Sequence, residues 1–389
     1  MDFSVMISML YHQLERTAPS ARRHILRIAC RKQFQILWKA IRKQQRKSSK
    51  RIWASVVPLP LVQAFAFPGQ PNPQLMSRFT NLLSVEEDVK VLVHAVPQGT
   101  APPHIPEGIR SIGVPSIWPQ SLGEHIKIGI IDTGVDYHHP DLQSVLSRGI
   151  NFVNPHTLPY DDNGHGTHIA GTIAASGRNG MKGIAPRSVL LPVKAFDHNG
   201  SAYVSDIIRG IDWCVHQGVD IINMSFGMRK RSASMLQAVR NASRSGVLIV
   251  ASSGNDGKRN FIDYPARYLQ TISVGAVDRK GRVAPFSNQG RRIDIYAPGE
   301  RIMSTWPHRK YQEMSGTSMA TSHVTGVIAL LLAKRPRVSP QAIKRILSAA
   351  QRPVRGNKQK ALEPGRIDAV KAFRRWRLES HALRRRNSN

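Results

Sequence analysis

The chain has 389 residues, of which 41% are apolar and 21% charged, and it contains 29 Gly, 25 Pro and two Cys. This composition is typical of a soluble globular protein with one large domain or two smaller ones, and it excludes a wholly disordered chain, a collagen and a disulfide scaffold. The unusual quantity is a formal net charge of +31, which taken alone suggests a nucleic-acid or anionic-membrane partner.

That charge is concentrated at the two ends of the chain. Residues 1–51 contain 13 basic and 2 acidic residues, and residues 334–389 contain 17 basic and 3 acidic ones. Residues 52–333 contain 26 basic and 20 acidic residues and are close to balanced. We therefore expect any weak contact with a polyanion or a membrane surface to involve the ends, and no apolar run reaches the ~20 residues of a spanning helix.

Residues 22–43 place Phe34, Leu37 and Ile41 at helical spacing among arginines and lysines. The pattern predicts a basic amphipathic helix within an N-terminal segment of residues 1–51. Such a helix could lie on an anionic membrane. Packing on its own domain, with a solvated charged face, is the favoured alternative.

The apolar stretch Ile52–Phe67 has the character of an export signal's apolar core, but it lies far from the start and contains Pro58 and Pro60. A strand-and-turn element fits the prolines better. We therefore expect a propeptide-like region over residues 52–104, with its last strand at Val89–Val93.

From Glu124 onward, short apolar runs alternate with amphipathic helical patterns. The candidate strands are Ile126–Ile131, Val219–Met224, Val247–Ala251 and Ile272–Val277, and the candidate helices are Val204–His216 and Ser232–Ser245. This alternation predicts a doubly wound α/β fold, with a mainly parallel sheet covered by helices on both faces. Active residues gather at the carboxyl ends of strands in such folds. We expect this domain to span residues 105–350, followed by a basic tail over 351–389.

The two cysteines lie far apart in the sequence, and Cys214 falls in an apolar helical pattern. We expect Cys30 and Cys214 to remain free thiols rather than to form a disulfide. Low cysteine usage and the lack of a signal at the amino terminus favour the cytoplasm over export, whereas Ile52–Phe67 keeps export open.

Two glycine-rich motifs follow apolar elements of the predicted sheet. Asp132 directly follows the first strand in Asp-Thr-Gly, which in isolation is a carboxylate-capped turn. His165 and His168 lie in Asp162–His168, which opens an apolar helix. A zinc site would need a third ligand, and none stands at a metal-site spacing.

Ser318 precedes the long apolar run Val324–Ala333, at the amino end of a predicted buried helix. A single serine there is an N-cap. With Asp132 and His165, however, it meets the needs of nucleophilic acyl transfer, because a serine needs a base and the base needs a carboxylate to hold its tautomer.

Together with the flanking motifs, these residues resemble the subtilisin-like serine proteases over residues 105–350. The lead-in Pro106–Trp118 is most similar to intracellular subtilisins of spore-forming bacteria. The supporting motifs are His139-Pro140-Asp141-Leu142, Gly171-Thr172, Gly183-Ile184-Ala185-Pro186, Ser225-Phe226-Gly227, Gly254-Asn255, Tyr264-Pro265-Ala266, Val274-Gly275-Ala276-Val277 and Ala297-Pro298-Gly299.

The resemblance implies a serine endopeptidase that hydrolyses peptide bonds through an acyl-enzyme intermediate. Ser318 would be the nucleophile, His165 the general base and then acid, and Asp132 the orienting carboxylate. The side-chain amide of Asn255 would join the Ser318 backbone N–H in an oxyanion hole. An inactive relative that serves as a binding module is the alternative, and these four intact residues argue against it.

The resemblance also assigns a substrate cleft, in which a peptide adds a strand to exposed backbone. Its edges would be Gly200-Ser201-Ala202 and Ser225-Phe226-Gly227, with Phe226 in the apolar wall of the pocket for the residue before the scissile bond. Asp256 matches a rim position of that pocket and Asp263 a position at its base. These acids would favour Lys or Arg in the substrate, or else they are two solvated loop residues.

No cofactor is expected for the chemistry. A structural calcium ion is left as an alternative. Asp141 matches a ligand of the family's tight calcium site, but the partner loop Ser176–Lys182 is shorter than usual and contains Arg178. The resemblance finally implies a self-processing precursor whose pro-region aids folding and inhibits the enzyme. We expect its removal near Gln98–Ile109.

Overall fold

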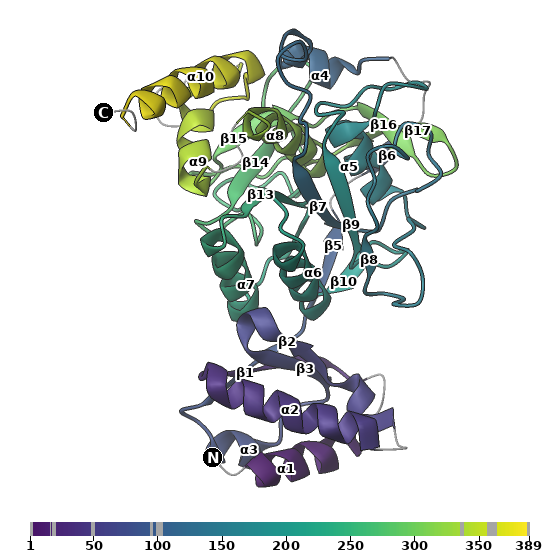
Figure 1. The fold of residues 1–389 in the computed structure, drawn as a ribbon, viewed down its shortest axis with the longest axis vertical. Coiled ribbons are helices and arrows are strands. Elements are labelled where there is room, and N and C mark those ends of the chain that lie inside the picture. Colours follow the sequence, from purple (N-terminus) through teal and green to yellow (C-terminus); the bar gives the residue numbers. More distant parts are fainter. Residues whose placement is uncertain are drawn as a thin grey trace.

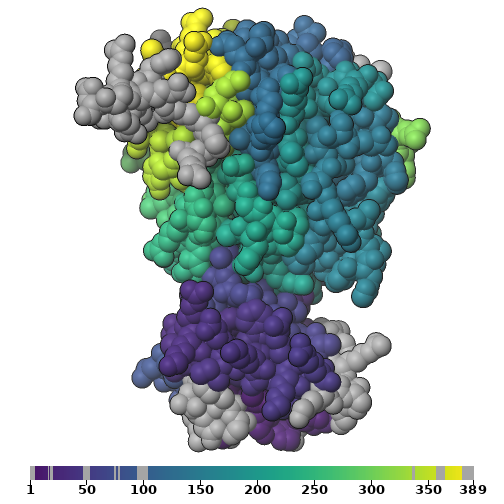
Figure 2. Space-filling model, viewed as in Figure 1, coloured from purple at the N-terminus to yellow at the C-terminus, as the bar shows by residue number. Residues whose placement is uncertain are grey.

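The computed structural model describes residues 3–15, 17, 21–47, 51–93, 96–98, 104–334, 338–355 and 364–386. A small N-terminal domain and a large α/β domain lie one after the other along the molecule's long axis (Figure 1). Figure 2 shows the small domain, in purple, seated against one end of the large one. Within these residues, no helix combines the length and the apolar character that crossing a membrane requires.

The N-terminal domain is a four-stranded antiparallel sheet of order β2-β3-β1-β4, packed against helices. Phe34, Leu37 and Ile41 of α2 are buried in its core, so this helix packs on its own domain. The elements are α1 (Phe3–Glu15), β1 (Arg23–Ile28), α2 (Arg31–Lys47), η1 (Arg51–Ser55), β2 (Val57–Leu59), η2 (Pro60–Val62), β3 (Ala64–Pro68), α3 (Pro73–Arg78) and β4 (Leu83–Glu87).

Two expectations for this region need correction. The helix predicted over residues 22–43 begins only at Arg31, because Arg23–Ile28 forms the strand β1, which is hydrogen-bonded to β3 on one side and β4 on the other. The boundary expected after residue 51 therefore divides one sheet. Residues on both sides of that boundary form a single domain.

Two short strands connect this domain to the large one. β5 (Lys90–Val93) lies between β10 (Ser201–Tyr203) and β12 (Phe226–Gly227) in a three-stranded sheet. β6 (Val96–Gln98) pairs with β17 (Lys310–Ser315), which also pairs with β16 (Ile302–Trp306).

The large domain contains the expected parallel sheet, with seven strands in the order β15-β14-β13-β11-β7-β9-β8. From β7 the chain order runs outward through β11, β13, β14 and β15 on one side, whereas on the other side the edge strand β8 comes before β9, which lies next to β7. Strands are thus added on both sides of β7, so the sheet is doubly wound and has a switch point there. The strands are β7 (Lys127–Asp132), β8 (Ile150–Asn151), β9 (Val189–Lys194), β11 (Ile221–Met224), β13 (Leu248–Ser252), β14 (Ile272–Val277) and β15 (Ile295–Pro298).

Helices cover both faces of this sheet (Figure 1). α5 and α8 pack on one face and α6 and α7 on the other. The helices are α4 (Glu107–Ser111), α5 (His165–Ala174), α6 (Val204–His216), α7 (Ala233–Arg244), α8 (Thr317–Leu332), α9 (Pro340–Ala349) and α10 (Ala369–Arg386), and η3 (Val114–Ser116) is a single 3₁₀ turn.

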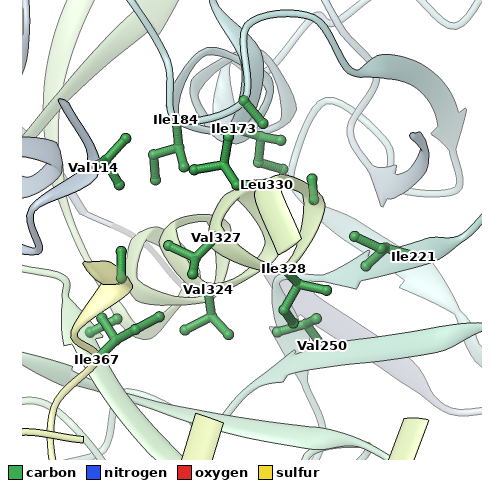
Figure 3. Packing of buried hydrophobic residues seen from close by; sticks show 14 of the residues in the cluster. Val114, Ile173, Ile184, Ile221, Val250, Val324, Val327, Ile328, Leu330 and Ile367 are labelled. Atoms are coloured by element: carbon green, nitrogen blue, oxygen red, sulfur yellow. The ribbon is translucent and has the colours of Figure 1, made fainter. Parts of the chain in front are cut away.

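α8 is the central helix of the core, and all of its residues are buried. Figure 3 shows Val324 and Ile328 directed toward the strand residues Ile221 and Val250. Because apolar contacts surround this helix, its N-terminal turn is fixed at the carboxyl edge of the sheet.

The prediction of a basic tail over residues 351–389 is wrong for the described part of that segment. Its described part returns to the core, where Ile367, Phe373 and Trp376 are buried, and α10 packs on α8 and α9. The arginines and lysines between these apolar residues face outward, which is why composition alone suggested a tail.

Candidate active site

Asp132, His165 and Ser318 come together at the carboxyl edge of the sheet. Asp132 is the last residue of β7, His165 the first of α5 and Ser318 the second of α8. His165 Nδ1 lies 2.7 Å from Asp132 Oδ1, and both side chains are buried. A proton held on Nδ1 by the carboxylate leaves Nε2 as the basic nitrogen.

A second buried carboxylate, Asp161, fixes the turn that carries His165. It accepts hydrogen bonds from the hydroxyl of Thr133 at 2.8 Å, from the hydroxyl of Thr167 at 2.6 Å, and from the backbone N–H groups of Asn163, Gly164 and Thr167. Asp161 thus connects the turn after β7 to the start of α5. Nothing in the sequence indicated this role, because an Asp immediately before a motif has no distinctive pattern.

The backbone of the same turn requires glycine at one position. Gly164 has φ 111°, and a Cβ there would lie 2.2 Å from the ring of Trp306. A residue with a side chain would therefore shift the entry into α5 and with it the base.

Ser318 and His165 are not joined by a hydrogen bond in this structure. The Ser318 hydroxyl donates a hydrogen bond to the backbone carbonyl of Ser225 at 2.8 Å, and His165 Nε2 has no hydrogen-bond partner among the described residues. A rotation about the side-chain torsion of Ser318 is the change that would bring the hydroxyl to the base. Hydrogen bonds between catalytic groups are often long or misaligned in enzymes that have no substrate bound.

Asn255 follows β13 and is oriented by its neighbour on α8. The backbone N–H and the hydroxyl of Thr317 donate to Asn255 Oδ1 at 2.9 and 2.8 Å. The Nδ2 group is therefore left as a donor, beside the first turn of α8, where backbone N–H groups have no acceptor within the helix. Thr317 is a further contributor that the sequence did not indicate.

The two expected cleft edges hold an extended strand, and that strand is β5 of the same chain. Leu92 stands opposite both Ser201 and Gly227, and the Val93 N–H donates to the Gly200 carbonyl at 3.1 Å. A Cβ on Gly200 would lie 2.7 Å from Val93, so glycine permits this close approach.

Ala202 and Phe226 complete these edges with buried side chains. Ala202 stands opposite Val91. The ring of Phe226 packs on Phe196 at a centroid distance of 4.9 Å. Its side chain thus belongs to the domain core, where the expected role was a pocket wall.

The two expected acids have different environments. Both line a hollow beside β5 together with Gly227 and Asn255. Asp256 forms an ion pair with Arg229 at 2.9 Å. Asp263 is 4% exposed, and its burial, with a smaller contribution from the charge of Asp256, raises its pKa to about 6.

The donors around Asp141 do not fit a calcium site. Its carboxylate accepts hydrogen bonds from the backbone N–H groups of Asn179 at 3.0 Å and Met181 at 2.8 Å, and from the Tyr311 hydroxyl at 2.8 Å. Calcium needs oxygen ligands with lone pairs directed at the ion, whereas this loop directs protons at the carboxylate.

No group of three or more His, Cys, Asp or Glu side chains is arranged to hold a metal in the described ranges. His168 is buried with Nε2 at 2.9 Å from the Ile302 carbonyl and 3.0 Å from that of Gln312, and burial lowers its pKa to about 3. The side chain is therefore a neutral donor between two elements. Both cysteines are free thiols, as expected.

A buried His–Asp pair beside a serine at a helix N-terminus, on a doubly wound sheet, is the type of site that serine peptidases use. The model of the Subtilase family matches residues 123–366, which is more than half of the chain. The chain belongs to this family, and it is a serine-type endopeptidase.

Known relatives agree with this assignment. The "Major intracellular serine protease" of Bacillus subtilis is 43% identical over 238 residues, which cover 58% of this chain and 75% of the relative. "Subtilisin DY" of Bacillus licheniformis is 41% identical over 250 residues, covering 63% and 90%. The "Intracellular serine protease" of Paenibacillus polymyxa is 41% identical over 236 residues, covering 58% and 72%.

Proposed function

We propose that this peptidase cuts proteins with Ser318 as nucleophile, His165 as base and Asp132 as orienting carboxylate. The observation that carries the proposal is the buried 2.7 Å contact between His165 Nδ1 and Asp132 Oδ1, with Nε2 of the same ring left without a hydrogen-bond partner among the described residues. The chemistry of these residues needs no cofactor.

The reaction proceeds in two halves. When the Ser318 hydroxyl leaves the Ser225 carbonyl and reaches His165 Nε2, it gives up its proton and attacks the substrate carbonyl carbon. Asp132 stabilises the imidazolium, and Asn255 Nδ2 with the Ser318 N–H binds the oxyanion. His165 then protonates the departing amine. A water molecule next attacks the ester on Ser318, with His165 again acting as base.

The first test replaces the nucleophile. We expect Ser318→Ala to lose labelling by a serine-directed phosphonate and to lower kcat on a peptide by about 10⁶, the loss known for this replacement in subtilisin. Ser322→Ala, one turn further along α8, is the matched control and retains labelling. A folded wild-type peptidase domain that is neither labelled nor active after limited proteolysis has removed the N-terminal domain would favour the inactive binding-module alternative.

We further propose that the enzyme prefers Lys or Arg before the scissile bond. Asp263 supports this, because it is a buried carboxylate in the hollow beside the cleft, and a cationic side chain would pair with it. Asp256 contributes less to this preference, because its charge is already paired with that of Arg229.

The matching experiment compares kcat/KM for peptides that differ only in that residue. We expect Arg to exceed Leu by about tenfold or more, corresponding to about 1.4 kcal/mol. Asp263→Asn removes the preference and Asp256→Asn leaves most of it. A wild-type preference for Leu or Phe would contradict the acidic pocket.

The N-terminal domain is proposed as the inhibitor of this site. Glu86 accepts hydrogen bonds from the hydroxyl of Ser232 at 2.8 Å and from the N–H of Ala233 at 2.7 Å, at the start of α7. Asp88 accepts from the N–H of Ser205 at the start of α6 at 2.8 Å, and Arg23 lies 3.2 Å from its other oxygen. These contacts at two helix N-termini support a docked domain that keeps β5 in the cleft.

A further inference from the structure

A second hollow, of about 320 Å³, lies beside α7 and contains four arginines. Arg231 precedes α7 and Arg240 lies on it, while Arg267 and Arg292 come from the loops that follow β13 and precede β15. All four side chains are exposed. Among the described residues, no carboxylate lines this basic hollow and none forms an ion pair with these arginines.

The lack of acidic partners sets these arginines apart from others in the large domain. Arg229 and Arg282, for example, each pair with a carboxylate. The acids close to the basic hollow are already engaged, since Asp294 pairs with Lys344 at 3.0 Å and Glu86 accepts hydrogen bonds at the start of α7. The guanidinium groups of the hollow therefore keep donors whose geometry fits carboxylates.

The surface between the arginines is apolar and aromatic. Leu269 is 65% exposed, and the rings of Tyr264 and Tyr268 pack at a centroid distance of 4.8 Å. Tyr268 is buried, and the Arg267 guanidinium lies 5.5 Å from the centroid of the Tyr264 ring. Because a nucleic-acid base needs a free aromatic face, these rings suit a peptide with acidic and apolar side chains better than a single strand of nucleic acid.

The basic hollow continues the substrate cleft. Residues 227–230 line the hollow beside β5, and Arg231, the next residue, lines the basic hollow. Met228 and Tyr264 exchange two backbone hydrogen bonds of 2.9 Å, which join the walls of the two hollows. Because β5 pairs antiparallel with β12, the N-terminal part of a strand in the cleft is directed toward Met228 and away from Ser225.

We propose that the basic hollow binds an acidic segment of a protein substrate, N-terminal to the scissile bond. Its carboxylates pair with the four arginines, and an apolar side chain of the same segment packs on Leu269. The role in substrate selection rests on the proposed function, whereas binding of the segment does not require Ser318. The arginines are exposed while the N-terminal domain is docked, so binding is measurable with the full-length chain.

The direct experiment measures the fluorescence anisotropy of a labelled Glu-Glu-Leu-Glu-Glu peptide titrated with full-length Ser318→Ala. We expect saturable binding, and binding of the Gln-Gln-Leu-Gln-Gln peptide that is weaker by about tenfold or more. Arg240→Glu combined with Arg292→Glu raises the Kd by about tenfold or more. Lys39→Glu combined with Arg374→Glu, on α2 and α10, is the control with the same change in net charge and leaves the Kd within about twofold.

Thermal melting confirms that both double variants fold. Equal losses of affinity in the two double variants would reveal a general attraction to a basic protein and overturn the inference. Absence of saturable binding overturns it as well. A single-stranded oligothymidylate that binds more tightly than the acidic peptide, and is weakened only by the substitutions in the hollow, would assign the hollow to nucleic acid instead.

A kinetic experiment tests the role in substrate selection. Two peptides of identical composition carry a run of Glu either before or after the same cleavable segment. In wild-type enzyme that the phosphonate labels, we expect the run placed before the bond to raise kcat/KM about fivefold, through a lower KM at constant kcat. Arg240→Glu combined with Arg292→Glu abolishes this difference.

The two proposals fail in distinguishable ways. Equal kcat/KM values for the two peptides overturn the role in substrate selection, while cleavage of both leaves the proposed function standing. A wild-type enzyme that the phosphonate does not label contradicts the proposed function. The titrations of Ser318→Ala then still decide whether the basic hollow binds an acidic segment.

Discussion

Ser225 lies between the active-site serine and the edge of the cleft. Its carbonyl accepts the Ser318 hydroxyl, and its chain neighbour Phe226 pairs with β5. A backbone that occupies the cleft therefore lies next to the carbonyl that accepts the Ser318 hydroxyl. If Ser318 acts as the proposed nucleophile, its hydroxyl must leave this carbonyl before it can react.

Asp263 also gives the substrate preference a pH dependence. Its pKa is raised to about 6, mainly by burial, so it is protonated and neutral below that pH and charged above it. We expect the ratio of kcat/KM for Arg over Leu peptides to rise about tenfold between about pH 5 and 7.5. Titration of any group that acts on both peptides changes the two kcat/KM values by the same factor, so its effect cancels in their ratio.

The control for this prediction is Asp263→Asn, for which the ratio stays flat across the same range. A wild-type ratio that does not change with pH, or that falls as pH rises, would show that Asp263 does not face the substrate.

The sequence motifs indicated the candidate catalytic residues, whereas the residues that support them had no recognisable pattern. Asp132, His165, Ser318 and Asn255 stand in motifs whose spacing is specific. Asp161 joins the turn after β7 to the start of α5 through five hydrogen bonds, and no local pattern announces such a set. The role of such a carboxylate depends on which donors the fold brings to it, and these donors are not recognisable from the neighbouring sequence.

At the level of elements, four strands of the parallel sheet were predictable because their apolar runs are continuous, whereas β8, β9 and β15 were not among the candidates. α6 occupies the predicted residues Val204–His216. β1 was not predictable from periodicity, because Arg23–Ile28 is short and basic and its strand form depends on pairing with β3 and β4.

The loop after α5 gives an expectation about metal dependence. Asp141 is satisfied by protein donors, and burial with the hydrogen bond to Asp141 raises the pKa of Tyr311, which keeps its hydroxyl a donor. We expect EDTA to change the Tm by less than about 1 °C, and Tyr311→Phe to lower it by about 2–4 °C through loss of a bond worth about 1–2 kcal/mol.

Differential scanning calorimetry in calcium and in EDTA measures both effects. The proteins are the Ser318→Ala variant and the same chain with Tyr311→Phe, so that self-digestion does not distort the melts. A large stabilisation by calcium would contradict the donor arrangement around Asp141.

At the level of the whole molecule, the basic ends are parts of the folded structure. α2 buries one face in the N-terminal domain, and α10 buries Phe373 and Trp376 in the core of the large one. Part of the basic excess is therefore presented on the outer faces of docked helices, where Lys39, Arg42, Arg374 and Arg375 are exposed. Polyanion or membrane-surface contact stays a prediction for those faces.

Docking of α10 predicts a stability effect far from the active site. We expect Trp376→Ala to lower the free energy of unfolding by about 3–5 kcal/mol and the Tm by several degrees, because a large buried ring leaves a cavity. The exposed Arg374→Ala is the control and shifts the Tm little. Equal melting of the two variants, again in the Ser318→Ala background, would show that α10 is dispensable.

The position of β5 in the cleft determines how the inhibition proposed for the N-terminal domain would depend on concentration. While the N-terminal domain is covalently attached, its strand is present at an effective concentration set by the short link, and dilution cannot remove it. Once the chain between the two domains is cut, the same contacts of Glu86 and Asp88 would become those of a separate molecule, whose occupancy obeys mass action. Cleavage of the chain would thus convert an attached inhibitor, whose effect does not depend on protein concentration, into a separate ligand that can be diluted or degraded.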